Sequence, residues 1–397
     1  MAHIMLRLSQ FFFRIILRQE PHAILSWRYF LPNQDAMVHL HRQTFLGAWA
    51  GFPRVIWCLI AVYSYTLWYL LHSWTQVYSI WKKRSARLFR RQHIARYRQA
   101  LDLFILALLH STPPVYYYRY RLYLYPESQW LNFIYTHELP HWHHMMSANA
   151  SKENMRLMND KQAFSIAMMQ RTLPAIATIY DKLAEQKFPQ EQLFSQRSLF
   201  IKPNIGSRKE GCYALYYQPE GGSYQLQGDA DEGGFSAKKI TLLLDQVTLS
   251  KHYLLQPLLE NHLLLGAHFK TTDLIVIRLV TCVCNRLPKS ICAQLEVPVE
   301  GQFQLVNTYT IHIDSGALVA DLGGNDERAQ RTRAVLPFFV PEWLELRRIA
   351  EQAHGYLLDI HSIGWDMAIT PRGVQIIEGN FNWGVAAHQR QGPIFAV

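Results

Sequence analysis

The stretch that decides the fold lies near the C-terminus: His361-Ser362-Ile363-Gly364-Trp365-Asp366-Met367-Ala368-Ile369-Thr370, then Pro371-Arg372-Gly373, then Val374-Gln375-Ile376-Ile377-Glu378-Gly379-Asn380. Two short apolar runs around a Pro/Gly break predict an antiparallel hairpin with one carboxylate inside each strand. A carboxylate in an apolar strand costs free energy unless it is paired or binds a metal. Glu378 and Asn380 are two residues apart, so both side chains leave the same strand face, where Asp366 can converge with them.

Oxygen-bearing side chains gathered on one sheet surface suit Mg2+, which prefers hard ligands and often shares its shell with substrate phosphates. The hairpin therefore predicts a metal site made of Asp366, Glu378 and Asn380. The alternative is that a nearby arginine satisfies each inward carboxylate as an ordinary ion pair. The hairpin alone leaves both possibilities open.

Length and composition indicate a folded chain of two or three domains. The chain has 397 residues, of which 49% are hydrophobic and only 18% charged, and this balance excludes a disordered protein. The formal charge of +10 is concentrated in the first hundred residues, which favours an anionic surface beside the N-terminal region. The five cysteines are odd in number and lack the spacing of a zinc knuckle, so reduced thiols of a cytoplasmic protein are expected. Arginines interrupt the first apolar run, so no cleavable signal peptide is expected.

The first hundred residues predict a helical, basic region that associates with a membrane. Residues 4–18 alternate apolar clusters with arginines at helical spacing, as in a helix at a lipid interface. Residues 55–81 carry no charge, are rich in Trp and Tyr, and are long enough to cross a bilayer. Basic residues flank this run on both sides, which favours peripheral or monotopic attachment to an anionic leaflet at the inner face of the membrane. A true span and an ordinary core helix remain alternatives.

Two further patterns carry weaker predictions. The basic run 82–98 is of a kind that can hold nucleic acid, but its neighbouring aromatics form a continuous apolar run, so no nucleic-acid partner is expected. Residues 137–141, His-Glu-Leu-Pro-His, spell the HExxH pattern of zinc peptidases, which requires both histidines on one helix face. Pro140 opposes a helix there, and we expect a histidine-rich connector.

From residue 159 onward the chain offers groups suited to phosphate. Asn159 or Asp160 is a natural N-cap for an amphipathic helix. A second helix is expected to follow the Leu173-Pro174 linker and to reach about Lys187. Residues 199–215 predict a strand, a flexible loop and a strand. A lysine ends the first strand, and the loop that follows it offers backbone amides to phosphate oxygens.

Two later segments carry polar groups inside apolar runs. Residues 254–260 predict a buried strand that ends in a proline-containing hinge, whose backbone groups can face a purine edge. Residues 273–281 predict an apolar strand with Arg278 inside it. A buried arginine nearly always has an anionic partner, from the protein or from a ligand.

In this order the segments resemble the ATP-grasp superfamily, and most closely its sugar-transfer-associated branch. The matching segments are NDKQAFS at 159–165, LFIKPNIGSRKEG at 199–211, QPLLE at 256–260, VIRLVT at 276–281, VPEW at 340–343, IGWDMAIT at 363–370 and IIEGNFNWG at 376–384. The resemblance implies an α+β class and an ATP-grasp fold, in which two α+β subdomains clasp ATP after the basic, aromatic-rich helical region. The expected domains are residues 1–100, helical and membrane-associating; 101–158, a connector or N-terminal subdomain; 159–260, a small subdomain with the phosphate loop; and 261–397, a C-terminal subdomain with the metal site.

The resemblance also assigns roles to individual residues. Lys161 and Lys202 would contact ATP phosphates, and Arg278 with Lys202 would act in catalysis by stabilising the transferring phosphoryl group. The remaining expected contacts are Gly206, Ser207 and Gly211 in a loop over the phosphates, Gln256 to Leu259 along the adenine, Glu260 near the ribose, and Asp366, Glu378 and Asn380 around Mg2+.

The implied activity is an ATP- and Mg2+-dependent carboxylate ligase, in which the carboxylate becomes an acyl phosphate that an amine or other nucleophile captures. Its partners would be a small-molecule carboxylate, the nucleophile and an anionic membrane surface, in cell-envelope polysaccharide or secondary-metabolite biosynthesis. Two alternatives are an ATP-grasp-type kinase and a non-catalytic nucleotide-binding membrane partner protein. Val276-Ile277 stand where the family tends to have polar residues before the arginine, and this departure supports the non-catalytic alternative. The residues that argue against it are intact: Lys161, Lys202, Arg278, Asp366, Glu378 and Asn380.

Overall fold

The structure, a computed structural model, describes residues 19–32, 35–47, 53–181, 197–206, 211–220, 223–228, 234–235, 252–299, 302–320, 331 and 333–395. Contacts divide the chain into two units. Unit 1 comprises Met1–Ala148, Ala320–Ala334 and Gly384–Val397, and unit 2 comprises Asn149–Val319 and Val335–Trp383. The divisions predicted at residues 100, 158 and 260 remain predictions. The helix predicted at 4–18 lies outside the described residues.

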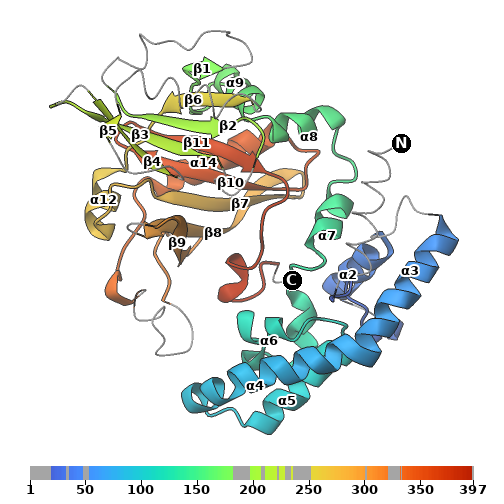
Figure 1. Cartoon of the computed structure of the whole chain (residues 1–397). Coiled ribbons are helices and arrows are strands. Elements are labelled where there is room, and N and C mark those ends of the chain that lie inside the picture. The colour runs from blue at the N-terminus through green and yellow to red at the C-terminus, as the bar shows by residue number, and fades with distance from the viewer. Residues whose placement is uncertain are drawn as a thin grey trace. The chain divides into compact units, whose positions relative to one another are not determined.

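The described part of unit 1 is helical (Figure 1). Its α-helices are α2 (Ala36–Gly47), α3 (Arg54–Leu67), α4 (Ser73–Gln92), α5 (Arg96–Phe104), α6 (Val115–Arg119) and α7 (Leu139–Met146). Two π-helical turns, Trp68–His72 and Ile105–Leu109, continue α3 into α4 and extend α5. Short 3-10 helices span Trp27–Phe30, Leu122–Leu124, Glu127–Asn132 and His388–Arg390.

The core of unit 1 is dominated by aromatic side chains. Trp68 from the first π-helical turn and Trp130 are fully buried there, together with Tyr117 and Tyr120. The rings of Tyr120 and Phe133 stack with their centroids 5.6 Å apart. Aromatic rings bury a large apolar area for few rotatable bonds, so this tyrosine-rich segment stabilises a helical unit of short elements.

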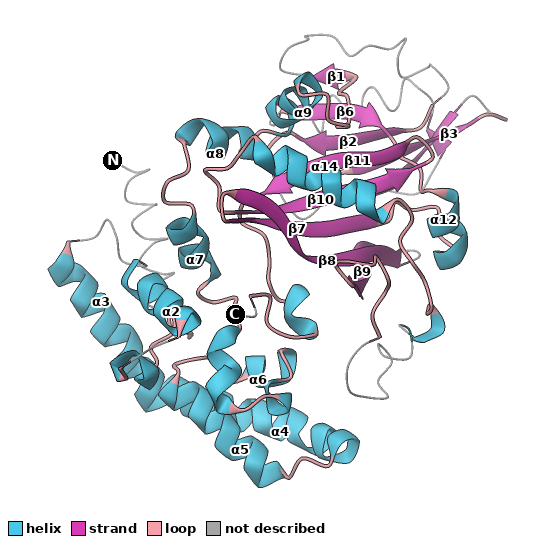
Figure 2. Cartoon of the chain, turned by 180° about the vertical axis from the view of Figure 1, so that it is seen from behind, coloured by secondary structure: helices cyan, strands magenta, loops and turns pink. Residues whose placement is uncertain are grey.

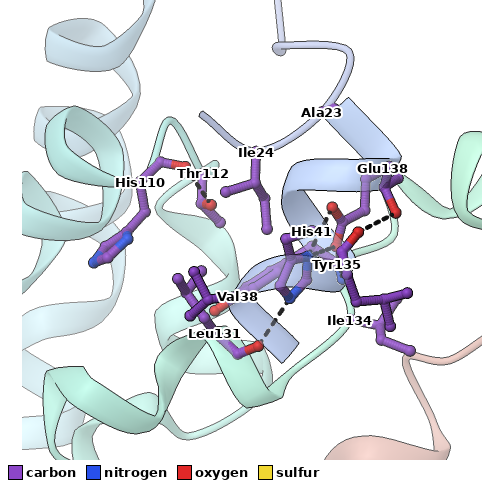
Figure 3. A network of polar contacts seen from close by, with 12 residues as sticks. Ala23, Ile24, Val38, His41, His110, Thr112, Leu131, Ile134, Tyr135 and Glu138 are labelled. Carbon is purple, nitrogen blue, oxygen red and sulfur yellow. Dashed lines mark hydrogen bonds and ion pairs between the residues drawn. The ribbon is translucent and has the colours of Figure 1, made fainter. Parts of the chain in front are cut away.

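A buried ion pair ties α2 to the segment before α7 (Figure 3). The Nδ1 atom of His41 lies 3.0 Å from Glu138 Oε1, and its Nε2 atom lies 2.8 Å from the Leu131 carbonyl oxygen. The backbone N–H of Tyr135 donates to Glu138 Oε1. Burial lowers the pKa of His41, but the Glu138 carboxylate and the Leu131 carbonyl outweigh it and raise this pKa above its ordinary value. His41 and Glu138 therefore form a charged pair inside the unit.

The same segment shows why the HExxH pattern does not form a zinc motif. The connector predicted here is wrong from Leu139 onward, because helix α7 begins at Leu139 and accepts Pro140 in its first turn, where no N–H is needed. His137 precedes this helix. Glu138 is occupied by His41. Among the described residues, no three His, Cys, Asp or Glu side chains are grouped as metal ligands.

Unit 2 contains two antiparallel sheets with flanking helices (Figures 1 and 2). One sheet has the order β1-β6-β2-β3-β4-β5 and the other the order β11-β10-β7-β8-β9. The strands of the first are β1 (Tyr180–Asp181), β2 (Leu199–Pro203), β3 (Tyr213–Gln218), β4 (Ser223–Gly228), β5 (Gly234–Phe235) and β6 (Tyr253–Pro257). Those of the second are β7 (Val276–Cys284), β8 (Leu287–Val299), β9 (Gln302–Ile311), β10 (Ser362–Thr370) and β11 (Gly373–Asn380). The helices are α8 (Lys152–Asn159), α9 (Lys161–Gln170), α12 (Leu263–Phe269) and α14 (Trp343–Gly355). The α+β class is confirmed.

The predicted C-terminal hairpin forms as β10 and β11. Their turn closes at Gly373, whose φ of +95° favours glycine. Strand β10 lies between β11 and β7 and is buried along nearly its whole length, with Asp366 the exception in its middle. Helix α14 packs over one face of this sheet through Leu346, Ile349 and Ala353 (Figure 2). The opposite face is left for the charged side chains.

The second helix predicted to reach Lys187 is wrong over residues 175–181, which are extended and end in β1. The backbone N–H of Ile179 donates to the Leu255 carbonyl, and Tyr180 pairs with Leu255 of β6. Ala175 also forms a parallel bridge with Ile376 of β11. Pairing with two sheets satisfies this backbone better than an isolated helical turn, so tertiary contacts override the local pattern. Residues 182–196 lie outside the described part.

Candidate functional site

A cavity of about 230 Å³ lies between the two sheets of unit 2. Strands β2, β3 and β6 of one sheet contribute side chains to it, as do β7, β8, β10 and β11 of the other. Its lining includes eight of the residues predicted from the sequence: Lys161, Lys202, Gly206, Gln256, Leu259, Arg278, Asp366 and Glu378. Lys202 and Glu378 thus face one space, although 176 residues separate them in the chain.

Lys161 is positioned by the start of α9. Asp160 is the N-cap, as predicted, and accepts a hydrogen bond from the Ala163 N–H. Asn204, just after β2, donates to Asp160 Oδ1 and accepts from the Gln162 N–H, which fixes the helix start beside the loop. Lys161 Nζ then donates to the Gly206 carbonyl at 2.8 Å and lies 3.7 Å from Glu378 Oε2.

Lys202 enters the cavity from the middle of the first sheet, where β2 pairs with β6 through Lys202 and Leu254. Its side chain is almost fully buried, and burial lowers its pKa to about 8. Glu378 opposes this shift, while the like charge of Lys161 adds to it. Among the described residues, no hydrogen-bond or ion-pair partner within reach neutralises this ammonium. A buried cation of this kind attracts an anionic ligand.

A row of charged residues crosses the second sheet. Asp366 is the register partner of Glu378 on β11 and of Arg278 on β7, so the three side chains share one face. Arg278 Nε lies 3.2 Å from Asp366 Oδ1 and 3.2 Å from Glu296 Oε1. Asn380 Nδ2 donates to Glu378 Oε1 at 3.2 Å.

This row holds more negative charge than Arg278 balances. Burial raises the pKa of Asp366, and the neighbouring Glu378 and Glu296 carboxylates raise it further, against the opposing effect of Arg278. Carboxylates that lie close together repel one another when both are charged, unless a cation lies between them. The row is therefore suited to a divalent metal.

Part of the cavity wall is apolar and also carries the amide side chain of Gln256. Ile176, Phe200, Leu258 and Leu259 contribute side chains to the wall. Gln256 is buried and donates through Nε2 to the Ile176 carbonyl, while its Oε1 has no hydrogen-bond partner among the described residues. An apolar slot with an unpaired acceptor fits a flat ring that carries an amino donor.

Four predicted residues are not in the lining. Ser207 lies outside the described residues. Gly211 adopts a φ of +70° beside Cys212, which does line the cavity. Asn380 reaches the site through Glu378. Glu260 is exposed and stands outside the lining.

Glu296 and Asp273 also line the cavity, and neither was predicted from the sequence. Asp273 Oδ1 accepts from the Tyr216 hydroxyl at 3.4 Å. Glu296 lies two residues after Gln294 in an otherwise apolar stretch of β8, and a polar residue at alternate positions marks a face that is not core. That signal was available, but only the strand register assigns this face to the cavity.

ATP and Mg2+ are not part of this structure, and the residues present fit both. The lysine side chains of β2 and of the start of α9 offer positive charge and hydrogen-bond donors suited to phosphates. Gln256 Oε1 offers a hydrogen-bond acceptor suited to an adenine amino group. Asp366, Glu378 and Asn380 supply oxygen ligands of the type that Mg2+ prefers. Since only two of these are carboxylates, substrate phosphates and water would complete the shell.

Two antiparallel sheets around a lysine-lined cavity, with paired carboxylates on the C-terminal hairpin, define the class of ATP-grasp proteins. Residues 141–392, more than half of the chain, match the family described as sugar-transfer associated ATP-grasp. The chain belongs to this family.

Solved structures that this chain matches include the ATP-grasp ligase PsnB complexed with minimal precursor, with 13% identity over 67% of this chain and 64% of that chain and a TM-score of 0.34. D-alanine–D-alanine ligase from Bacillus anthracis complexed with ATP shows 11% identity over 59% of each chain, with a TM-score of 0.35. VanG D-Ala:D-Ser ligase from Enterococcus faecalis shows 11% identity over 61% of this chain and 59% of that chain, with a TM-score of 0.39. The chain thus spans less than two thirds of the length of these proteins. The comparison with curated proteins gives no match.

Proposed function

We propose that this protein is an ATP- and Mg2+-dependent carboxylate ligase that forms a bond between a small-molecule carboxylate and an amine or other nucleophile. The observation that carries the proposal is the meeting of Lys202, Arg278, Asp366 and Glu378 in one cavity of unit 2. Family membership supports the choice of ATP as the nucleotide.

In this proposal the side chains position the substrates and neutralise the negative charge of the phosphates, and no side chain forms a covalent intermediate. Lys161 and Lys202 hold the phosphates, and Asp366, Glu378 and Asn380 hold the metal, whose charge offsets that of the phosphates. Arg278 lies within ion-pair distance of Asp366, so its guanidinium is fixed beside the metal site and stabilises the transferring phosphoryl group. Gln256 accepts from the adenine amino group.

The substrates and the cellular place of the reaction belong to the same proposal. The carboxylate and the nucleophile are small molecules of cell-envelope polysaccharide or secondary-metabolite biosynthesis. The basic and aromatic N-terminal region attaches the enzyme to the inner face of the membrane, and one of its helices, Val55–Gln92, has the length and composition of a membrane span.

The test is turnover by the purified chain with Mg-ATP and pairs of carboxylate and amine, followed by ADP release and product mass. A joined product with release of ADP supports the ligase. A product that has gained phosphate makes the protein a kinase. Stabilisation by Mg-ATP in a thermal shift without any turnover favours a non-catalytic partner protein. Glu378→Gln must lose the turnover, and turnover that this variant keeps contradicts the assigned site.

A further inference from the structure

One face of the long helix Val55–Gln92 is apolar and open to solvent. Its members recur three or four residues apart from Val55 to Val62 and again from Leu70 to Tyr78, and the exposed Thr66 lies midway between these two sets. They are between 50% and 75% exposed: Val55, Leu59, Val62, Leu70, Trp74 and Tyr78. We call this set the apolar face. Ile56, Tyr63 and Leu71 lie beside it and are also exposed. A contiguous apolar patch of this kind marks an interaction site.

The opposite face of the same helix is bound to protein. Tyr65 donates its hydroxyl to the Ala23 carbonyl, and Trp68 donates its ring N–H to the Ala107 carbonyl. Trp68 and Ser73 are both buried although five residues apart, because the π-helical turn Trp68–His72 inserts one residue into the helix. This turn keeps the buried face on the protein, and hence the apolar face on the solvent side, along both halves of the helix.

The helix and the residues that flank it in the sequence carry charges of one sign. From residue 36 to residue 101 the sequence has ten Lys and Arg residues and no Asp or Glu. Six of them follow the apolar face on the same helix and are exposed: Lys82, Lys83, Arg84, Arg87, Arg90 and Arg91. An apolar surface with a dense positive flank and no acidic residue matches an anionic lipid headgroup layer above acyl chains.

We propose that the apolar face lies in the plane of an anionic bilayer, inserted to the depth of the headgroup and acyl boundary, and that Val55–Gln92 does not cross the membrane. This inference deepens the membrane attachment in the proposed function by naming its surface and orientation. The bilayer is the occupant that fits, because its negative surface complements the six exposed Lys and Arg side chains that follow the apolar face on the same helix.

The packing of the buried face argues against a span. A helix of 38 residues is about 57 Å long, whereas the hydrocarbon core is about 30 Å thick. A crossing segment has lipid around it, but here one side is covered by α5 and by the chain near Ala23. Helix α5 carries Asp102, which accepts a hydrogen bond from Tyr117. Such polar groups have no place in hydrocarbon, while a helix with one protein face and one lipid face accommodates them in water.

The test is flotation of the full chain, without nucleotide, with vesicles of phosphatidylcholine alone or with about a third phosphatidylglycerol. Wild type floats with the anionic vesicles and is released by salt. The double variant Leu59→Glu, Leu70→Glu loses at least about tenfold in vesicle affinity, because two carboxylates replace inserted side chains. Its matched control is Leu344→Glu on α14 of unit 2, which is 73% exposed and floats like wild type. Lys82→Gln, Lys83→Gln and Arg87→Gln together lower the affinity about a hundredfold.

Three outcomes overturn the inference: no flotation of wild type, equal flotation of the Leu59→Glu, Leu70→Glu variant, and wild type that resists extraction by alkaline carbonate, which indicates a span. Circular dichroism and the unfolding midpoint of each variant verify the fold. Mg-ATP binding is measured separately without vesicles and is unchanged in the Leu59→Glu, Leu70→Glu variant. A failure of the ligase proposal and a failure of this one are therefore distinguishable.

Discussion

At the scale of single residues, Lys202 and Asp366 depart from their ordinary pKa values in opposite directions for one reason. Burial disfavours the charged form of each, so it lowers the pKa of Lys202 and raises that of Asp366. A ligand that brings phosphates to the lysine and a metal to the carboxylate restores both charges. The shifts are a cost that ligand binding offsets, which is common where a fold prepares a binding site.

The titration of Lys202 makes the affinity for Mg-ATP depend on pH in a definite direction. Its charged form binds phosphate, and this form is lost as the pH rises through about 8. We expect the affinity for Mg-ATP to rise toward pH 8 as Asp366, whose pKa is raised, loses its proton, and to fall up to tenfold per pH unit above about pH 8 as Lys202 loses its charge. Calorimetric titration between pH 6.5 and pH 9.5 measures this. Lys202→Arg stays charged across the range, so its profile has no break near pH 8. Equal breaks in both proteins would assign the titration to another group.

The carboxylates of Asp366 and Glu378 are expected to make turnover depend on the Mg2+ concentration. Glu378→Gln keeps the size of the side chain but removes a carboxylate that contacts Lys161 and Asn380. We expect turnover to fall at least about a hundredfold and the Mg2+ concentration for half-maximal activity to rise. Glu260→Gln is the control, because Glu260 is exposed and outside the cavity lining. If both substitutions have the same effect, the carboxylates do not act through a metal in this cavity.

At the scale of elements, the helices and strands that could be predicted are those whose structure is set by residues close together in the sequence. Hairpin β10–β11 was predictable because two apolar runs, a Pro-Arg-Gly turn and inward carboxylates all lie within twenty residues. The start of α9 was predictable from its capping residue. The extended path through Ile179 was not, because its hydrogen bonds go to β6, some 75 residues later. Glu296 and Asp273 were missed for the same reason, since no spacing in the sequence shows which strands line one cavity.

Gly211 tests how the loop between β2 and β3 is held. A Cβ atom there would lie 2.7 Å from the hydroxyl of Tyr253, and its φ of +70° is unfavourable for other residues. We expect Gly211→Ala to lower the free energy of unfolding by about 1–2 kcal/mol and to weaken Mg-ATP binding. Both are measured by denaturant titration and calorimetry.

Tyr253→Phe in the Gly211→Ala background separates the clash from backbone strain. Removal of the hydroxyl leaves the ring carbon at 3.7 Å as the nearest atom, so part of the loss is recovered. Gly355→Ala, where a Cβ meets nothing within 4 Å, is the neutral control. A Gly211→Ala variant as stable as this control would contradict the tight approach of Tyr253.

At the scale of the whole molecule, the chain separates its two kinds of surface. Every residue that lines the cavity belongs to unit 2, and every member of the apolar face belongs to unit 1. Each unit has its own core, one of aromatic side chains and one of aliphatic and aromatic residues on the five-stranded sheet and α14. Ligands of the two surfaces can therefore be studied independently in the intact chain.

Hydrogen exchange of the full chain tests this separation. Mg-ATP at a hundred times its Kd stabilises the unit that binds it by about 2.7 kcal/mol, so exchange slows in β2, β10 and β11. Anionic vesicles instead slow exchange in α3 and α4, because the headgroup layer covers the apolar face and disfavours fraying of the helix. Vesicles of phosphatidylcholine alone protect neither set, since the positive flank contributes only where the lipid is negative. A chain in which Mg-ATP protects α3 and α4 as strongly as β10 would show that the two surfaces are coupled, and attachment to the membrane would then be a means of controlling turnover rather than of placing the enzyme.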